Sequence, residues 1–126
     1  VKMSHDVVAD ALNKIMNAKR AGKTSLEVTG RSKLLLSVLA LAKLREYIKD
    51  YKIVGKQLKI EIGNLNKCNS IKPRFTVKVE QIKKYEKRYL PARDMGILII
   101  STPKGLMAND TALEKNLGGC LIAYMY

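Results

Sequence analysis

Residues 95–105 read Met-Gly-Ile-Leu-Ile-Ile-Ser-Thr-Pro-Lys-Gly, an apolar run that changes abruptly into a polar turn. The β-branched residues of 95–100 predict a buried strand. Residues 102–105 predict a turn, in which proline stiffens the backbone and glycine permits close approach by another molecule. Two hydroxyl groups and a lysine at such a turn suit a polar, anionic partner.

The rest of the second half predicts a mostly β unit with short helices. Residues 75–79 alternate as a strand, and residues 80–89 can form a short helix that Pro91 ends. Thr111-Ala-Leu-Glu114 has the form of a capping box, which predicts a helix to Asn116 that Gly118 and Gly119 terminate. Residues 121–126 close the chain as a strand.

The first half predicts an αβαββ unit. Apolar residues recur with helical spacing over 4–20, with Ser4 as the expected cap and Gly22 as the stop, and again over 32–45, which Ser32 can cap. Strands are expected at residues 25–29, 51–54 and 58–62. The last two would form a hairpin with Gly55 at its turn.

A change in composition divides these halves. Residues 64–74 are polar and basic and contain Pro73, so we place an internal boundary near 64–66. The predicted fold is α+β, with two small packed α/β domains at residues 1–64 and 65–126.

The net charge narrows the class of partner. The 126 residues carry 24 Lys and Arg against 11 Asp and Glu, a net charge of +13. Nucleic acid, an anionic membrane surface or an acidic protein could offset such a surplus. Binding to a membrane surface would need a basic amphipathic helix, and every such helix here needs its apolar face for the core. Neither a membrane-spanning segment nor a signal peptide is evident. We therefore expect a soluble, cytoplasmic protein that binds nucleic acid.

The positive charge is spread over both halves. Residues 1–62 hold thirteen basic and six acidic side chains, a net charge of +7, and residues 63–126 hold eleven and five, a net charge of +6. The densest basic window is 67–93. Its lysines at 83, 84 and 87 and its arginine at 88 should face outward from the helix at 80–89. Such a window supplies affinity for phosphates but little sequence discrimination.

Metal and enzyme chemistry find little support. Cys68 and Cys120 are far apart, and His5 is the only histidine, so a four-ligand zinc site is excluded and two reduced thiols are expected. A metal-dependent nuclease would need clustered carboxylates, whereas the acidic residues of the first half are spread among lysines. We expect no catalytic residue, no metal and no cofactor.

Several stretches resemble one family. Ser-Thr-Pro-Lys-Gly-Leu-Met at 101–107, followed by Leu-Gly-Gly at 117–119, is similar to the signature of the eighth universal protein family of the small ribosomal subunit. The stretches 8–13, 65–68 with 71–75, and 87–94 with 96–99 agree in collinear order, and the last two resemble the archaeal and eukaryotic branch. The resemblance covers essentially the whole chain.

The resemblance implies two packed α/β domains and a structural role in the small subunit. The family binds the central domain of small-subunit ribosomal RNA early and helps to assemble the subunit platform, beside neighbouring ribosomal proteins. Its C-terminal domain makes the main RNA contact and its N-terminal domain a secondary one. Carried over to this sequence, the RNA-binding residues are Ser101, Thr102, Pro103, Lys104, Gly105, Leu117, Gly118, Gly119, Lys67, Lys72, Arg74, Lys87, Arg88, Tyr89 and Arg93 in the main contact, and Asn17 and Lys33 in the secondary one.

Three positions depart from the family pattern. Pro103 replaces a Ser or Thr, which removes a hydroxyl and an amide donor. Cys120 stands where a polar or charged residue is frequent. Ala108 stands where the family usually has a helix cap, a role that Asn109 or Thr111 can take over. Stacking on bases is limited to Tyr85, Tyr89 or Tyr126. A free RNA- or DNA-binding regulator remains the alternative function.

Overall fold

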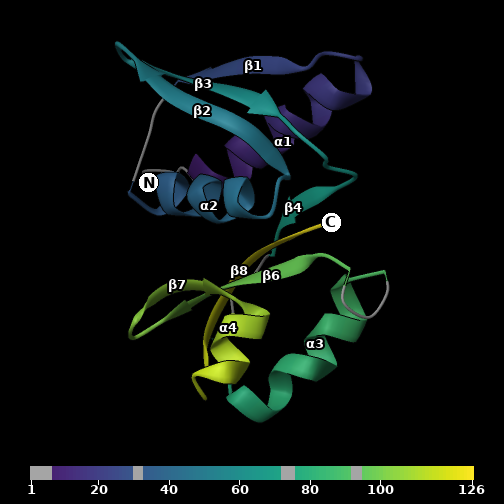
Figure 1. The fold of residues 1–126 in the computed structure, drawn as a ribbon, viewed down its shortest axis with the longest axis vertical. Coiled ribbons are helices and arrows are strands. Elements are labelled where there is room, and N and C mark those ends of the chain that lie inside the picture. The colour runs from purple at the N-terminus through teal and green to yellow at the C-terminus, as the bar shows by residue number, and fades with distance from the viewer. Residues whose placement is uncertain (1–6, 30–32, 72–75, 92–94) are drawn as a thin grey trace, which may run out of the picture. The chain divides into compact units, whose positions relative to one another are not determined.

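The computed structural model describes residues 7–29, 33–71, 76–91 and 95–126. It divides into two compact units, Val1–Leu65 and Asn66–Tyr126. Each unit combines helices with an antiparallel sheet, which confirms the predicted α+β class (Figure 1). None of the helices in these described ranges is both long enough and apolar enough to cross a membrane.

The first unit has the predicted αβαββ order. Its sheet is antiparallel, in the order β1-β3-β2, and Figure 1 shows both helices on one face of it. Leu58 and Ile60 of β3 are fully buried on this face, with Leu35 of α2. The elements are α1 Val7–Arg20, β1 Ser25–Thr29, α2 Lys33–Leu44, β2 Ile48–Val54 and β3 Gln57–Ile62.

The helix ends of this unit follow the left-handed capping pattern. Gly22 has a φ of 78°, its N–H donates to the Lys19 carbonyl at 3.0 Å, and the Lys23 N–H donates to Ala18 at 2.9 Å, so Gly22 ends α1 as predicted. Glu46, with a φ of 66°, ends α2 in the same way without being glycine. The expected caps Ser4 and Ser32 lie outside the described residues.

The second unit is built on a five-stranded antiparallel sheet. Its strands lie in the order β4-β8-β6-β7, with β5 also paired to β8. Figure 1 shows α3 and α4 on one face of this sheet. The elements are β4 Cys68–Ser70, β5 Thr76–Val77, the 3₁₀ helix η1 Val79–Gln81, α3 Ile82–Tyr89, β6 Ile97–Thr102, β7 Gly105–Ala108, α4 Asn109–Glu114 and β8 Gly119–Met125.

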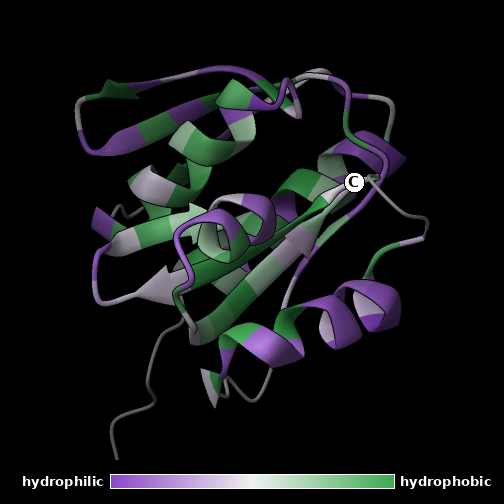
Figure 2. Ribbon diagram, turned by 60° about the horizontal axis from the view of Figure 1, so that its bottom comes forward, coloured by the Kyte–Doolittle hydropathy of each residue, from purple (hydrophilic) through white to green (hydrophobic). Residues whose placement is uncertain are grey.

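The core of this unit lies between the central strands and the two helices. Leu98, Ile100 and Leu121 of β6 and β8 are fully buried, and they pack with Ile82 of α3 and Ala112 of α4. Figure 2 shows the hydrophobic colour along β6 and β8 and the hydrophilic colour along most of α3. The predicted apolar run therefore forms the centre of the sheet.

The structure corrects two predicted strands. The strand expected over 75–79 is described only at Thr76–Val77, because Val79 already begins η1, whose Gln81 side-chain oxygen accepts the Lys78 N–H at 2.9 Å. The strand expected to begin at Met95 begins at Ile97, after Gly96 with a φ of 90°. It continues through Thr102, and β4 and β7 were not predicted at all.

The predicted capping box is wrong. The helix α4 begins at Asn109 after Ala108, which makes no side-chain cap bond, and Thr111 lies inside its first turn. Asn116, with a φ of 58°, terminates it, and the Leu117 N–H donates to the Ala112 carbonyl at 2.9 Å. The two glycines that follow are therefore not the terminators.

Candidate nucleic-acid interface

The hairpin of β6 and β7 turns through only two residues, Pro103 and Lys104. The Thr102 Oγ1 accepts the Lys104 N–H at 3.1 Å and donates to the Gly105 carbonyl at 2.7 Å. Gly105 has a φ of 114°, a conformation that favours glycine. The Thr102 side chain is buried, and its hydroxyl group donates its hydrogen bond within the turn. Contact with RNA is therefore expected less for the Thr102 hydroxyl than for the Ser101 hydroxyl.

Gly119 begins β8 and Gly118 precedes it, and both are required by the close packing of strands. A Cβ on Gly119 would lie 2.2 Å from the Ser101 carbonyl oxygen, and one on Gly118 would lie 2.5 Å from the Val77 carbonyl oxygen. Side chains cannot be accommodated at these distances without moving backbone. The surface between β5 and β6 is therefore lower at these two glycines than at positions that carry side chains.

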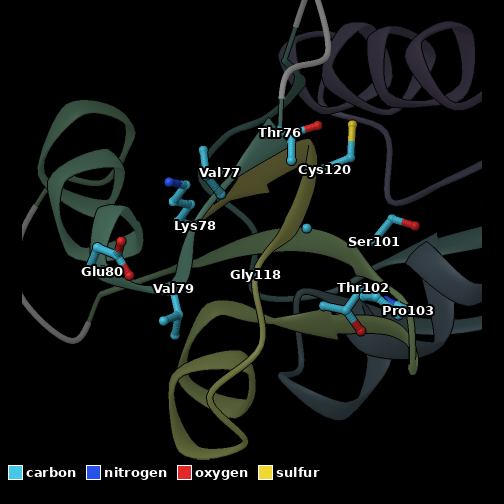
Figure 3. Close-up of a pocket in the computed structure, with 11 residues that line it drawn as sticks. Thr76, Val77, Lys78, Val79, Glu80, Ser101, Thr102, Pro103, Gly118 and Cys120 are labelled. Atoms are coloured by element: carbon cyan, nitrogen blue, oxygen red, sulfur yellow. The ribbon is translucent and has the colours of Figure 1, made fainter.

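A shallow groove of about 680 Å³ lies above this lowered surface. Its floor contains Gly118 and Gly119, and the groove lies entirely within the second unit (Figure 3). It is lined by Thr76, Val77, Lys78, Val79, Glu80, Ser101, Thr102, Pro103, Gly118, Gly119 and Cys120.

Three small polar side chains cross this groove in one row. Cys120 of β8 is paired with Thr76 of β5 on one side and with Ser101 of β6 on the other. Directly paired residues project to the same face of a sheet, with Cβ atoms about 5 Å apart. This polar row, Thr76, Cys120 and Ser101, presents hydroxyl, thiol and hydroxyl groups in sequence. Such low-profile donors and acceptors suit close approach to sugars and base edges.

Charged side chains lie at the two sides of the groove. Lys78 and Glu80 line one side of it, and Pro103 lines the other. Lys104 is exposed on the adjacent turn. Cations beside a neutral row can bind flanking phosphates, while the row itself remains free to meet uncharged groups.

The structure brings together only part of the predicted set. Ser101, Thr102, Pro103 and the two glycines line the groove, whereas Leu117 is half-buried against the core. Other described residues of the set lie outside the groove: Lys67 is exposed beside β4, Lys87 and Arg88 are exposed on α3, and Asn17 and Lys33 are exposed on α1 and α2 of the first unit. Lys72, Arg74 and Arg93 lie outside the described residues.

Three tyrosines of the second unit are engaged with one another. Tyr89 stacks on Tyr124 with ring centroids 5.3 Å apart, and Tyr124 stacks on Tyr126 at 6.3 Å. The Arg88 guanidinium lies 5.7 Å from the Tyr89 ring. These half-buried rings pack against the core, so a stacking role toward RNA bases gains no support from their placement.

Sequence reasoning missed Thr76, Lys78, Glu80 and Cys120 as lining residues. Lys78 lies inside the basic window, which is a weak signal. Thr76 lies in a two-residue strand, and its position beside Cys120 arises only from sheet pairing. Periodicity cannot reveal such a neighbour because the two residues are far apart in sequence.

The two thiols differ in environment. Cys68 is buried, and desolvation raises the pKa of its thiol to about 12, whereas Cys120 is half-buried in the groove; both are free, as predicted. Within the described ranges, no group of three or more His, Cys, Asp or Glu residues could hold a metal ion. Of the two thiols, the one in the groove, Cys120, is therefore the more accessible.

Comparison with known proteins gives the family. The model of the family described as Ribosomal protein S8 matches residues 6–126. The chain is 43% identical to small ribosomal subunit protein uS8 of Nanoarchaeum equitans, 44% to that of Archaeoglobus fulgidus and 43% to that of Thermoplasma acidophilum, each over 98% of this chain and the whole relative. These matches confirm the resemblance, and the chain belongs to the Ribosomal protein S8 family.

Proposed function

We propose that this protein is a structural constituent of the small ribosomal subunit that binds the central domain of the small-subunit ribosomal RNA and helps to assemble the platform. Membership of a family of small-subunit proteins supports a structural role in the ribosome, in the cytoplasm, rather than an enzymatic one. Neighbouring ribosomal proteins would be its other partners.

The groove of the second unit is the observation that carries this proposal. A row of hydroxyl, thiol and hydroxyl groups above a glycine floor allows an irregular RNA helix to approach the backbone closely. Shape and small polar contacts of this kind are how proteins recognise RNA helices that they cannot read through a narrow major groove. The groove would therefore supply specificity.

Attraction would come from the charge around the groove. The second unit has a net charge of +6, from eleven basic and five acidic residues. Lys67, Lys87 and Arg88 are exposed in it. In the first unit, Asn17 and Lys33 are exposed and are proposed to touch a second RNA segment. These contacts would add affinity and position the protein without reading sequence.

Replacing Ser101 with alanine tests the groove. One hydrogen bond contributes about 1 kcal/mol, so affinity for a central-domain RNA fragment should fall by roughly fivefold while the melting temperature stays unchanged. Filter binding or calorimetry measures the first and circular dichroism the second. Ser70→Ala on β4 is the matched control, since Ser70 is similarly half-buried on a strand of the same sheet but lies outside the groove.

Thr102→Val separates the roles of the two hydroxyls. It removes both bonds of the β6–β7 turn, so it should lower stability more than affinity. If Ser101→Ala binds the fragment as tightly as the unmodified protein, the groove is not the RNA site.

A further inference from the structure

Four exposed cations follow one another along α3. Lys83 and Lys87 form one pair at i, i+4 spacing, and Lys84 and Arg88 form a second pair beside it. Like charges at this spacing destabilise a helix. No ion pair joins any of the four to a carboxylate among the residues that the structure describes. The helix therefore keeps a cationic face that no ion pair with a described carboxylate neutralises.

The helix does contain a carboxylate that could form an ion pair with one of these cations. Glu86 is the only acidic residue of α3 and stands three positions after Lys83, a spacing at which side chains meet. Its Oε2 instead accepts a hydrogen bond from the Asn109 Nδ2 at the start of α4. The carboxylate is thereby held toward α4 rather than among the cations.

Asn109 is itself fixed by the sheet. Its side chain is buried, and its Oδ1 accepts the Leu98 N–H at 3.1 Å. The pairing of β7 with β6 ends at Ala108 and Ile99, so the Asn109 amide continues the ladder where the strand has stopped. The Asn109 side chain thus continues the hydrogen bonding of β6 and also holds the Glu86 carboxylate of α3.

We infer that the four cations of α3 bind RNA phosphates along the helix. We further infer that Asn109 is a positioning residue, which keeps the Glu86 carboxylate away from these cations. The inference rests on the proposed function. The ligand is the phosphate backbone, contacted without regard to base sequence. These cations lie near the groove, because α3 directly follows η1, whose Glu80 lines the groove. At 1.5 Å per residue, Arg88 lies about 9 Å beyond Ile82 at the start of α3, within reach of the same bound RNA.

Asn109→Asp releases the carboxylate while sparing the sheet. An aspartate oxygen still accepts the Leu98 N–H, but it cannot donate to Glu86 and repels it. Affinity for the central-domain fragment should fall about threefold, and the salt dependence should become shallower by about one unit, as for one lost phosphate contact. Asn64→Asp, at an exposed position of the first unit, makes the same charge change and should alter affinity by less than twofold.

The double variant Asn109→Asp with Glu86→Gln restores the bond with donor and acceptor exchanged. Its net charge equals that of the unmodified protein, and affinity and salt slope should both return to within about twofold. Glu86→Gln alone should change affinity by less than twofold, because the carboxylate is already held away from the RNA. This variant keeps an acceptor for Asn109, so it does not depend on the folding of Asn109→Asp.

The outcomes separate the two proposals. An unmodified protein that does not bind the fragment would overturn the proposed function. Binding that is normal in Asn109→Asp, or that Glu86→Gln strengthens fivefold or more, would overturn the role of Asn109 and leave the groove untouched. Failure of the double variant to recover, despite a normal melting temperature, would also overturn it.

Discussion

Gly119→Ala is expected to destabilise the second unit by roughly 3 kcal/mol or more, a large fraction of the stability of a small domain. The new Cβ would lie 2.2 Å from the Ser101 carbonyl oxygen, 2.8 Å from its carbonyl carbon and 3.0 Å from the Thr102 Cα. All three atoms belong to the backbone of the central strand β6. Relief of the clash therefore requires the β6–β8 pairing to open. Thermal and urea unfolding followed by circular dichroism would measure the loss.

Gly22→Ala is the control for this variant. A Cβ on Gly22 would meet nothing within 4 Å, and only its φ of 78° disfavours alanine. Its cost should be about 1 kcal/mol, from the left-handed backbone alone. A Gly119→Ala protein that melts like the unmodified one, or no lower than Gly22→Ala, would contradict the close approach of β8 to β6.

Replacing Lys83, Lys84, Lys87 and Arg88 together with alanine should weaken RNA binding about 100-fold at physiological salt. Four phosphate contacts, each contributing roughly 0.7 kcal/mol, give this size of loss. The salt dependence should become shallower by about 3, and unrelated RNA of the same length should lose affinity by a similar factor. Alanine is the best helix former, so α3 should persist. Titrations at several salt concentrations provide the measurement.

A quadruple variant of the first unit is matched in charge. Lys49, Lys52, Lys56 and Lys59 are exposed on the β2–β3 hairpin, and their replacement removes the same four charges. A loss of affinity and of salt slope equal to that of the α3 variant would mean that net charge alone acts. A loss confined to the central-domain fragment would mean that α3 reads sequence.

Regular segments of the fold could be predicted because the signal is local. The alternation of Leu58 and Ile60 with charged neighbours, and the left-handed Gly22, each depend on a few adjacent residues. The central strand β6 was placed within two residues for the same reason, since four consecutive apolar side chains are buried from Ile97 to Ile100.

The sequence misled where tertiary contacts decide. Thr111 has the spacing of a capping box, yet α4 begins two residues earlier, where the Asn109 side chain bonds to β6. Gly118 and Gly119 resemble helix terminators, but Asn116 already ends the helix and the glycines serve strand packing. In both cases the deciding partner is distant in sequence, so no local pattern contains it.

The candidate site was predicted in part for the same reason. The Ser101 turn and the glycine pair are visible as short motifs, and they do meet in one groove. Their common neighbour Thr76 is not visible, because a two-residue strand has no periodicity. The sequence therefore identified two sides of the groove but not the polar row that joins them.

Alkylation of the two cysteines tests the central claim most directly. Cys120 lies in the polar row, while Cys68 is buried and the raised pKa of its thiol, about 12, leaves almost no reactive thiolate at neutral pH. N-ethylmaleimide should therefore modify Cys120 alone in the free protein, as mass spectrometry would show. A saturating central-domain RNA fragment should slow this modification at least tenfold, and a fragment from another rRNA domain should not. Unchanged alkylation of Cys120 in the bound complex would contradict the claim that the groove holds the RNA.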